Sequence, residues 1–162
     1  MKQSKVSKNL PLAFAIALSV AACAHNKSNV ETKAVSGGAS APVGLSAQWL
    51  KLKGAKADMM VQMTNNTKKE LEIDPSDIQC LRGSNKGSLR HNFGSSFRIG
   101  VIVLAPEESR TDLLYCNFGA KGTGNITVKV DQVYEANEDT DKRKVVAKNL
   151  SWEIVSTGTM AE

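Results

Sequence analysis

Methionine and histidine are the side chains of this sequence that could bind a soft metal ion. Met59, Met60 and Met63 lie close together, and His91 follows 28 residues after Met63. Thioether and imidazole groups suit Cu(I), so this set would fit a periplasmic carrier of copper or another small ligand. On an extended strand, however, Met59 and Met63 share one face and Met60 lies on the other. We therefore expect core or edge methionines and no metal site, and keep the carrier as the alternative function.

His91 is also the side chain on which catalysis would depend, because the other histidine, His25, precedes the folded domain. No G-x-S-x-G elbow exposes a nucleophile. Nearness in sequence does not make a catalytic triad, which is defined by geometry. We expect no enzymatic activity and no cofactor. The serines near His91 in the sequence are Ser84, Ser88, Ser95 and Ser96.

Two further segments have compositions that could attract ligands. Glu135, Glu138, Asp139 and Asp141 could attract Ca²⁺, but they lack the ligand order and central glycine of an EF-hand. Residues 119–124 are glycine-rich, but they lack the spacing of a phosphate-binding loop and lead into a strand. The first segment is expected to be a solvated hairpin and the second a turn.

A group of basic side chains flanks a stretch rich in Gly, Ser and Asn. Binding residues favour loops on a rigid scaffold, so this segment is the best candidate for a contact loop. The alternative is a solvated loop rim without a partner. The residues are Arg82, Lys86, Arg90, His91 and Arg98.

Cys80 and Cys116 remain as an even pair once Cys23 is set aside. In an exported protein such a pair indicates a disulfide. Both cysteines fall on apolar strand faces, as an internal crosslink would require. Two buried free thiols are the alternative.

The first 22 residues predict a secretory signal peptide. Lys2, Lys5 and Lys8 precede a short uncharged run at 10–22, which is too short to span a bilayer. Residues 20–23, Val-Ala-Ala-Cys, resemble the lipobox of bacterial lipoproteins. The resemblance implies that Cys23 becomes the lipidated N-terminus, and Ala24 in place of Asp implies sorting to the outer membrane. An ordinary signal peptide with a free Cys23 is the alternative.

The composition of the chain predicts a linker followed by one folded domain. Residues 23–43 are rich in Ser, Ala, Gly and Asn and predict a lipidated flexible tether. The domain is expected at 44–157, with a disordered tail at 158–162. Without the signal peptide, 18 basic and 16 acidic residues remain, a net charge of +2. That charge does not indicate a nucleic-acid partner.

Short apolar runs separated by turn residues predict an all-β fold, an antiparallel β-sandwich. Alternation places Leu150, Trp152 and Ile154 on one face, and Leu114 with Cys116 on another. The expected strands are 49–52, 59–64, 71–73, 78–81, 97–104, 113–118, 126–130, 145–146 and 150–154.

The segment 45–157 resembles the immunoglobulin-like (telokin-like) domains of bacterial lipoproteins of unknown function. The matching features are a strand followed by Asn65-Asn66-Thr67 and the Pro-Glu-Glu-Ser stretch at 106–109 before a Leu-rich strand. The resemblance implies a fold and an anchor but no chemistry. The expected function is a non-enzymatic binding or assembly module of the cell envelope. It would be held on the outer membrane by the lipid on Cys23, with its domain in the periplasm or at the cell surface, and would bind another envelope protein.

Overall fold

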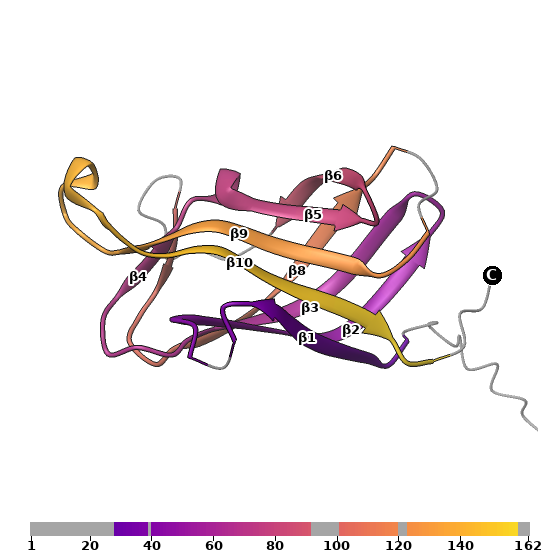
Figure 1. Ribbon diagram of the computed structural model, residues 1–162, viewed down its shortest axis with the longest axis horizontal. Coiled ribbons are helices and arrows are strands. Elements are labelled where there is room, and N and C mark those ends of the chain that lie inside the picture. The colour runs from indigo at the N-terminus through magenta and orange to yellow at the C-terminus, as the bar shows by residue number, and fades with distance from the viewer. Residues whose placement is uncertain (1–27, 39, 92–100, 120–122, 159–162) are drawn as a thin grey trace, which may run out of the picture.

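The computed structural model describes residues 28–38, 40–91, 101–119 and 123–158. They form antiparallel strands with two short 3₁₀ helices, so the predicted all-β class is confirmed (Figure 1). No helix in these ranges is long and apolar enough to cross a membrane. The elements are β1 (Val30–Ser36), β2 (Val43–Lys53), β3 (Lys56–Asn65), β4 (Leu71–Ile73), η1 (Pro75–Asp77), β5 (Ile78–Arg82), β6 (Asn85–His91), β7 (Ile102–Leu104), β8 (Ser109–Asn117), β9 (Ile126–Glu135), η2 (Thr140–Lys142) and β10 (Lys144–Ser156).

The strands form one sheet that is nearly closed into a barrel. Along the hydrogen bonds the order is β1-β10-β9-β5-β6-β8-β3-β2, with β4 and β7 paired beside β9. The two ends of this path meet at β1 and β2. There Ser28 pairs with Leu50, and the Ala47 N–H donates to Thr32 Oγ1 at 2.7 Å. Closure leaves few unpaired strand edges.

β6 joins the two halves of the barrel by bending. Its first residues pair with β5, where Gly87 lies opposite Cys80. Its last residues, from Ser88 to His91, pair with β8. The sequence predicts a contact loop around Arg82, Lys86 and Arg90. That expectation is wrong from Asn85 onward, because these residues complete the backbone pairing of β5.

The interior is filled by the alternating faces that the sequence predicted. Leu150, Trp152 and Ile154 are buried, and Leu114 and Cys116 face the same core. Of the expected strand at 97–104, only β7 lies in the described part of the chain as a strand. Residues 97–100 lie outside the described residues.

The predicted flexible tether is wrong for much of its length. β1 lies inside the segment 23–43 and pairs with β10 over its whole length. Ala41 and Val43 are buried in the core. β1 forms because its backbone hydrogen-bonds to β10. A sequence rich in small polar residues does not predict such a strand from its own pattern. The folded domain therefore includes β1 and does not begin at residue 44.

The two motifs behind the immunoglobulin-like resemblance meet at one corner. Asn65 is fully buried, and its amide donates to the carbonyls of Lys69, Leu104 and Ala105. The Glu108 carboxylate accepts the Ala105 N–H at 2.7 Å. Burial alone would raise the pKa of Glu108, but this bond and the charge of Arg110 lower it. Both motifs therefore act as turn-stabilising residues.

Candidate interaction surface

The outer face of β2, β3, β8 and β6 carries side chains in regular rungs. The strand register aligns Trp49, Met60 and Leu113 in an apolar rung. All three side chains are half-buried. Aromatic residues and Met are enriched at protein interfaces, so the rung has the composition of a contact site.

The next rung combines an aromatic ring with charges of both signs. Lys51 lies opposite Asp58, Asp58 opposite Tyr115, and Tyr115 opposite Arg90. Tyr115 is the most exposed aromatic side chain among the described residues, at 40 %. A third rung of Lys53, Lys56, Asn117 and Ser88 follows toward the strand ends.

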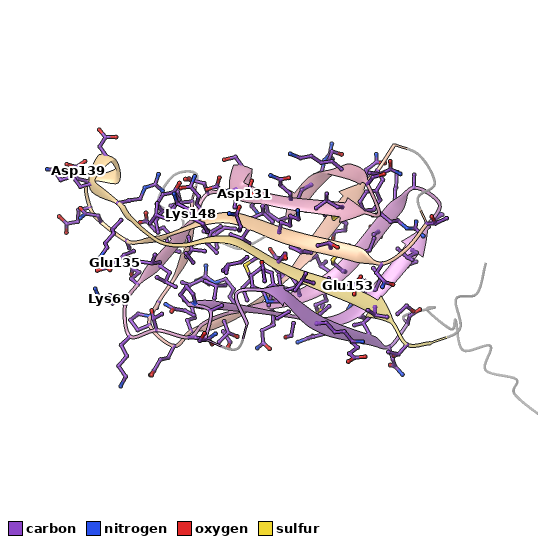
Figure 2. The ribbon with its side chains drawn as sticks, in the orientation of Figure 1. Lys69, Asp131, Glu135, Asp139, Lys148 and Glu153 are labelled. Atoms are coloured by element: carbon purple, nitrogen blue, oxygen red, sulfur yellow. A yellow bond between two sulfur atoms is a disulfide. The ribbon has the colours of Figure 1, made fainter. Side chains whose placement is uncertain are left out.

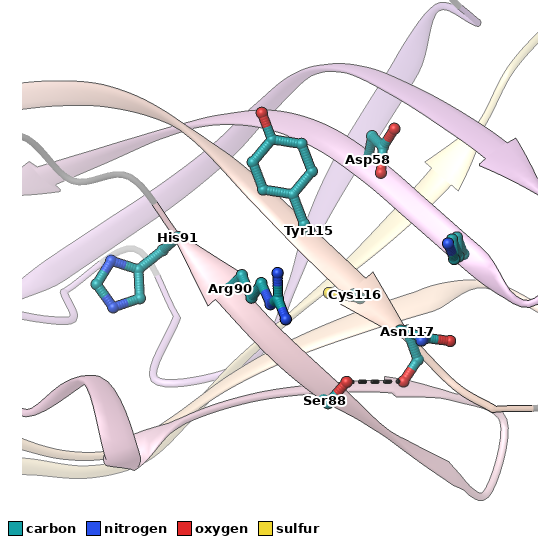
Figure 3. Close-up of a pocket in the computed structure, with 8 residues that line it drawn as sticks. Asp58, Ser88, Arg90, His91, Tyr115, Cys116 and Asn117 are labelled. Atoms are coloured by element: carbon teal, nitrogen blue, oxygen red, sulfur yellow. Dashed lines mark hydrogen bonds between the residues drawn. The ribbon is translucent and has the colours of Figure 1, made fainter.

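These rungs border a shallow hollow of about 700 Å³. Figure 3 shows Tyr115 and Asp58 rising from β8 and β3, with Arg90 beside them on β6 and His91 at the end of that strand. The Ser88 hydroxyl donates to the Asn117 carbonyl at 3.4 Å, linking β6 to β8 at the rim. The hollow thus offers an aromatic ring, a carboxylate and a guanidinium. The lining residues are Lys56, Asp58, Ser88, Arg90, His91, Tyr115, Cys116 and Asn117.

The Cys80–Cys116 disulfide lies beneath this hollow, and the predicted pairing is confirmed. The two Cα atoms are 6.3 Å apart, within the usual range for a disulfide. The bond joins β5 to β8 across β6, which lies between them in the sheet. Because both cysteines are buried, the bridge fixes the backbone under the hollow and takes no part in its chemistry.

A buried cluster of charges lies at the other end of the barrel. Glu72 is fully buried, and Arg143 lies 3.6 Å from it and 3.3 Å from Asp74. The Arg143 guanidinium also stacks 4.5 Å from the centre of the Tyr134 ring. Burial alone would lower the pKa of Arg143, but the hydrogen bond to Asp74 and the charges of Asp74 and Glu72 raise it.

Asp77 belongs to the same cluster and accepts a hydrogen bond from Tyr134. Burial, together with the charges of Asp74 and Asp131, raises the pKa of Asp77. Burial and the charges of Asp77 and Asp74 likewise raise the pKa of Tyr134. The cluster ties β4 and η1 to the β9–β10 hairpin. Arg143 forms ion pairs with Glu72 and Asp74 of the same chain, so we interpret the cluster as structural.

The predicted contact residues separate into two places. Arg90 and His91 line the hollow. Arg82 instead donates to the Gly54 carbonyl at 3.1 Å, and Lys86 is exposed beside the β5–β6 turn. Arg98 and Cys23 lie outside the described residues. The part of the predicted contact loop that carries Arg82 and Lys86 is therefore a hairpin, because β5 and β6 pair directly.

Sequence reasoning missed the hollow's residues from β3 and β8, chiefly Asp58 and Tyr115. The signal was available for Tyr115, because the apolar faces of its neighbours Leu114 and Cys116 force it outward. For Asp58 no local pattern existed, since its place beside Tyr115 depends on the pairing of β3 with β8.

The other candidates have structural roles among the described residues. Met59 and Met63 are fully buried core residues, as expected, and Met60 lies on the outer face. The acidic segment forms the predicted hairpin, in which Asp139 pairs with Lys142 at 2.7 Å. No group of three or more His, Cys, Asp or Glu side chains in the described ranges is arranged to hold a metal ion.

Comparison with known proteins gives no further constraint. The chain matches no protein-family model, no curated protein and no solved structure at a significant level. The surface geometry and the chain's own sequence are therefore what a functional proposal must rest on.

Proposed function

We propose that this protein is a lipid-anchored lipoprotein of the bacterial cell envelope and a non-enzymatic binding or assembly module. Its outer face on β2, β3, β8 and β6 would bind another envelope protein. The observation that carries this proposal is the exposed Tyr115, set between Asp58 and Arg90 on a sheet held by a disulfide. Exposed aromatic side chains flanked by Arg are typical binding hot spots.

The anchor part of the proposal rests on the sequence. The lipobox-like residues 20–23 support lipid attachment at Cys23, and Ala24 supports the outer membrane. The domain would then lie in the periplasm or at the cell surface. Two or three acyl chains on one cysteine hold a protein durably, whereas one chain holds it only reversibly.

We also propose that the domain is immunoglobulin-like. In a constant-type immunoglobulin domain, strands A-B-E-D form one sheet and C-F-G the other. Here the order β2-β3-β8-β6 and the order β5-β9-β10 follow the same pattern in chain sequence. Two features differ from that family: β6 joins both halves, and the disulfide links β5 to β8.

Site-specific crosslinking in intact cells tests the binding face. A photo-crosslinking amino acid replaces Tyr115, and in a matched strain it replaces Lys148, which is exposed on β10. We expect a discrete crosslinked product from position 115 and none from position 148. The product should weaken severalfold with Arg90→Glu. Equal products from both positions, or a product insensitive to Arg90→Glu, would contradict the proposed face.

Fractionation tests the anchor separately. Metabolic labelling with a fatty-acid analogue should mark the wild-type chain and leave Cys23→Ser unmarked. A wild-type chain that is unlabelled and soluble after cell breakage would exclude the lipoprotein assignment while leaving the binding face open to its own test.

A further inference from the structure

The position of β1 shortens the link between the proposed anchor and the folded domain. Ser28, the first described residue, pairs with Leu50, and Asn29 accepts the Thr157 N–H at 2.9 Å. Ser28 follows Cys23 by only five positions in the sequence. Five extended residues reach at most about 17 Å. The end of the barrel that holds Ser28 would therefore lie close to the membrane surface.

Three parts of the chain converge at that end of the barrel. The Arg82 guanidinium donates to the Gly54 carbonyl, which joins the β5–β6 turn to the β2–β3 turn. At Gly83 a Cβ would lie 3.2 Å from the Thr123 carbonyl, so the end of the β8–β9 connection, just before β9, is adjacent. Figure 1 shows these strand ends on the same side as the end of β10.

Basic side chains outnumber acidic ones at this end. We name it the basic end. The described residues 50–56, 82–86, 117–119 and 123–125 contain no Asp or Glu. Three carboxylates border these segments. Asp58 lies opposite Lys51, Glu31 on β1 lies 3.8 Å from Lys33, and Glu153 accepts a hydrogen bond from Asn125. The basic end comprises Lys51, Lys53, Lys56, Arg82 and Lys86.

The opposite end of the barrel is acidic. The β9–β10 hairpin carries Glu135, Glu138, Asp139 and Asp141 against one lysine, Lys142, over residues 135–142. Figure 2 shows Glu135 and Asp139 at this end, with Lys69 paired to Glu135 at 2.7 Å. The molecule is therefore polarised along its long axis, although its net charge is small.

We infer that the basic end docks on the headgroups of anionic phospholipids, which fixes the orientation of the domain on its membrane. This inference rests on the proposed lipid anchor at Cys23. Charge complementarity supports it, because each Lys or Arg near an anionic bilayer strengthens binding by about fivefold. The acidic hairpin points away from the surface, where like charges repel it. The outer face is then turned to the side of the molecule, and Lys56 lies where its hollow borders the basic end.

Lysine labelling of the acylated full chain tests the docking. The protein is reconstituted in vesicles of phosphatidylethanolamine with phosphatidylglycerol, and in vesicles of phosphatidylcholine alone. Reductive methylation rates are read for each lysine by mass spectrometry. On the anionic vesicles, Lys51, Lys53 and Lys86 should be methylated severalfold more slowly than on the neutral ones. Lys68, Lys144 and Lys148, which are exposed toward the acidic end, serve as internal controls and should not change.

Charge reversal makes the test specific. In the variant Lys51→Glu/Lys53→Glu/Lys86→Glu, protection of Lys56 on anionic vesicles should disappear. The matched variant Lys68→Glu/Lys144→Glu/Lys148→Glu should keep it. Protection should also vanish in about 1 M salt, where the Debye length is about 3 Å.

The outcomes separate docking from anchoring, because mass spectrometry of the same samples reports acylation of Cys23. Acylation without protection of the basic end would overturn the docking and leave the anchor intact. Protection without acylation would support the docking and overturn the anchor. Equal protection on both kinds of vesicle would overturn the assignment to anionic lipid.

Discussion

Gly87 shows how one residue permits the bend that joins the two halves of the barrel. A Cβ at this position would lie 2.9 Å from two ring atoms of Phe118 and 3.2 Å from Cys80 Sγ. Real side chains do not approach a buried ring that closely. Gly87→Ala should therefore lower the free energy of unfolding by about 1–3 kcal/mol, the usual cost of overpacking a core.

Urea denaturation with a matched glycine variant checks this prediction. Gly44 is also a strand glycine, and a Cβ there meets nothing closer than 3.4 Å, at the Asn66 amide. Gly44→Ala should change the denaturation midpoint little. Similar losses in the two variants would mean that replacing glycine itself, and not the Phe118 contact, is the cause.

Asp77 predicts a pH dependence of stability. Burial and the charges of Asp74 and Asp131 raise its pKa in the folded protein. Its contribution to stability is then fully present below the unfolded pKa of about 3.9, and is lost as the pH rises through the folded pKa. Asp77→Asn mimics the neutral acid and keeps an acceptor for Tyr134. It should raise the melting temperature at pH 7, and the gain should shrink as the pH falls to about 4.

Asp141→Asn is the control for that measurement, because Asp141 is exposed in the β9–β10 hairpin. It should leave the difference between pH 7 and pH 4 unchanged. A melting temperature of Asp77→Asn that is higher than wild type by the same amount at both pH values would contradict the titration of Asp77 as the cause.

Prediction from the sequence works for residues whose environment is set by their neighbours along the strand. Tyr115 must face outward because Leu114 and Cys116 face inward. Glu72 is the opposite case. Alternation with Leu71 and Ile73 predicts an outward side chain, yet Glu72 is fully buried. β4 has partners on both edges, and Arg143 supplies charge from a segment 71 residues away. That compensation is not encoded near Glu72.

Among the elements, β1 is the strand that the sequence pattern failed to predict. Its burial alternates only weakly, because it covers the barrel at the edge next to β10. The core strands were predicted in place but often too short: 71–73 and 78–81 match β4 and β5, 49–52 covers only part of β2, and 145–146 with 150–154 are two parts of β10. β-Branched residues at alternate positions specify a strand and its inner face, but not where the strand ends. A covering strand needs mainly backbone hydrogen bonds, which almost any polar sequence supplies.

Thr32 tests how β1 closes the barrel. Its hydroxyl accepts the Ala47 N–H, at the point where the pairing of β2 with β3 shifts register. Thr32→Val keeps the shape of the side chain but removes the acceptor, which should cost about 1 kcal/mol. Amide hydrogen exchange should speed up at Ala47 and along β1. Thr32→Ser should restore protection, and equal exchange in the Val and Ser variants would exclude the hydroxyl as the cause.

At the scale of the whole molecule, the disulfide connects two halves of the sheet, β5-β9-β10 and β2-β3-β8. Between β5 and β8, only β6 joins these halves by backbone hydrogen bonds. The predicted signal peptide and the two cysteines left after Cys23 were enough to predict the pair, and strand parity put both sulfurs inside. What the sequence could not indicate is that the bridge spans a strand. Cys80 and Cys116 each lie opposite a residue of β6, Gly87 and Leu89, so the bond runs over that strand within the core.

Cys80→Ser/Cys116→Ser should therefore weaken the molecule without changing its topology. The cysteines are 36 residues apart, and closing a loop of that size stabilises the fold by roughly 3–4 kcal/mol in the chain-entropy model. Most of this effect acts on the unfolded chain, which becomes less compact when the crosslink is removed. The urea midpoint should thus fall, and the dependence of the unfolding free energy on urea should become steeper.

Backbone pairing of β5, β6 and β8 does not depend on the sulfurs, so the variant should keep the wild-type far-ultraviolet circular dichroism below its new midpoint. Crosslinking from position 115 should persist there as well, because Cys116 is a buried part of the hollow's lining and the exposed charged and aromatic groups come from other residues. If the product were lost while the fold remained, the disulfide would have to set the shape of the binding face itself. An unchanged midpoint would instead show that the backbone pairing of the sheet, and not the bridge, holds the two halves together.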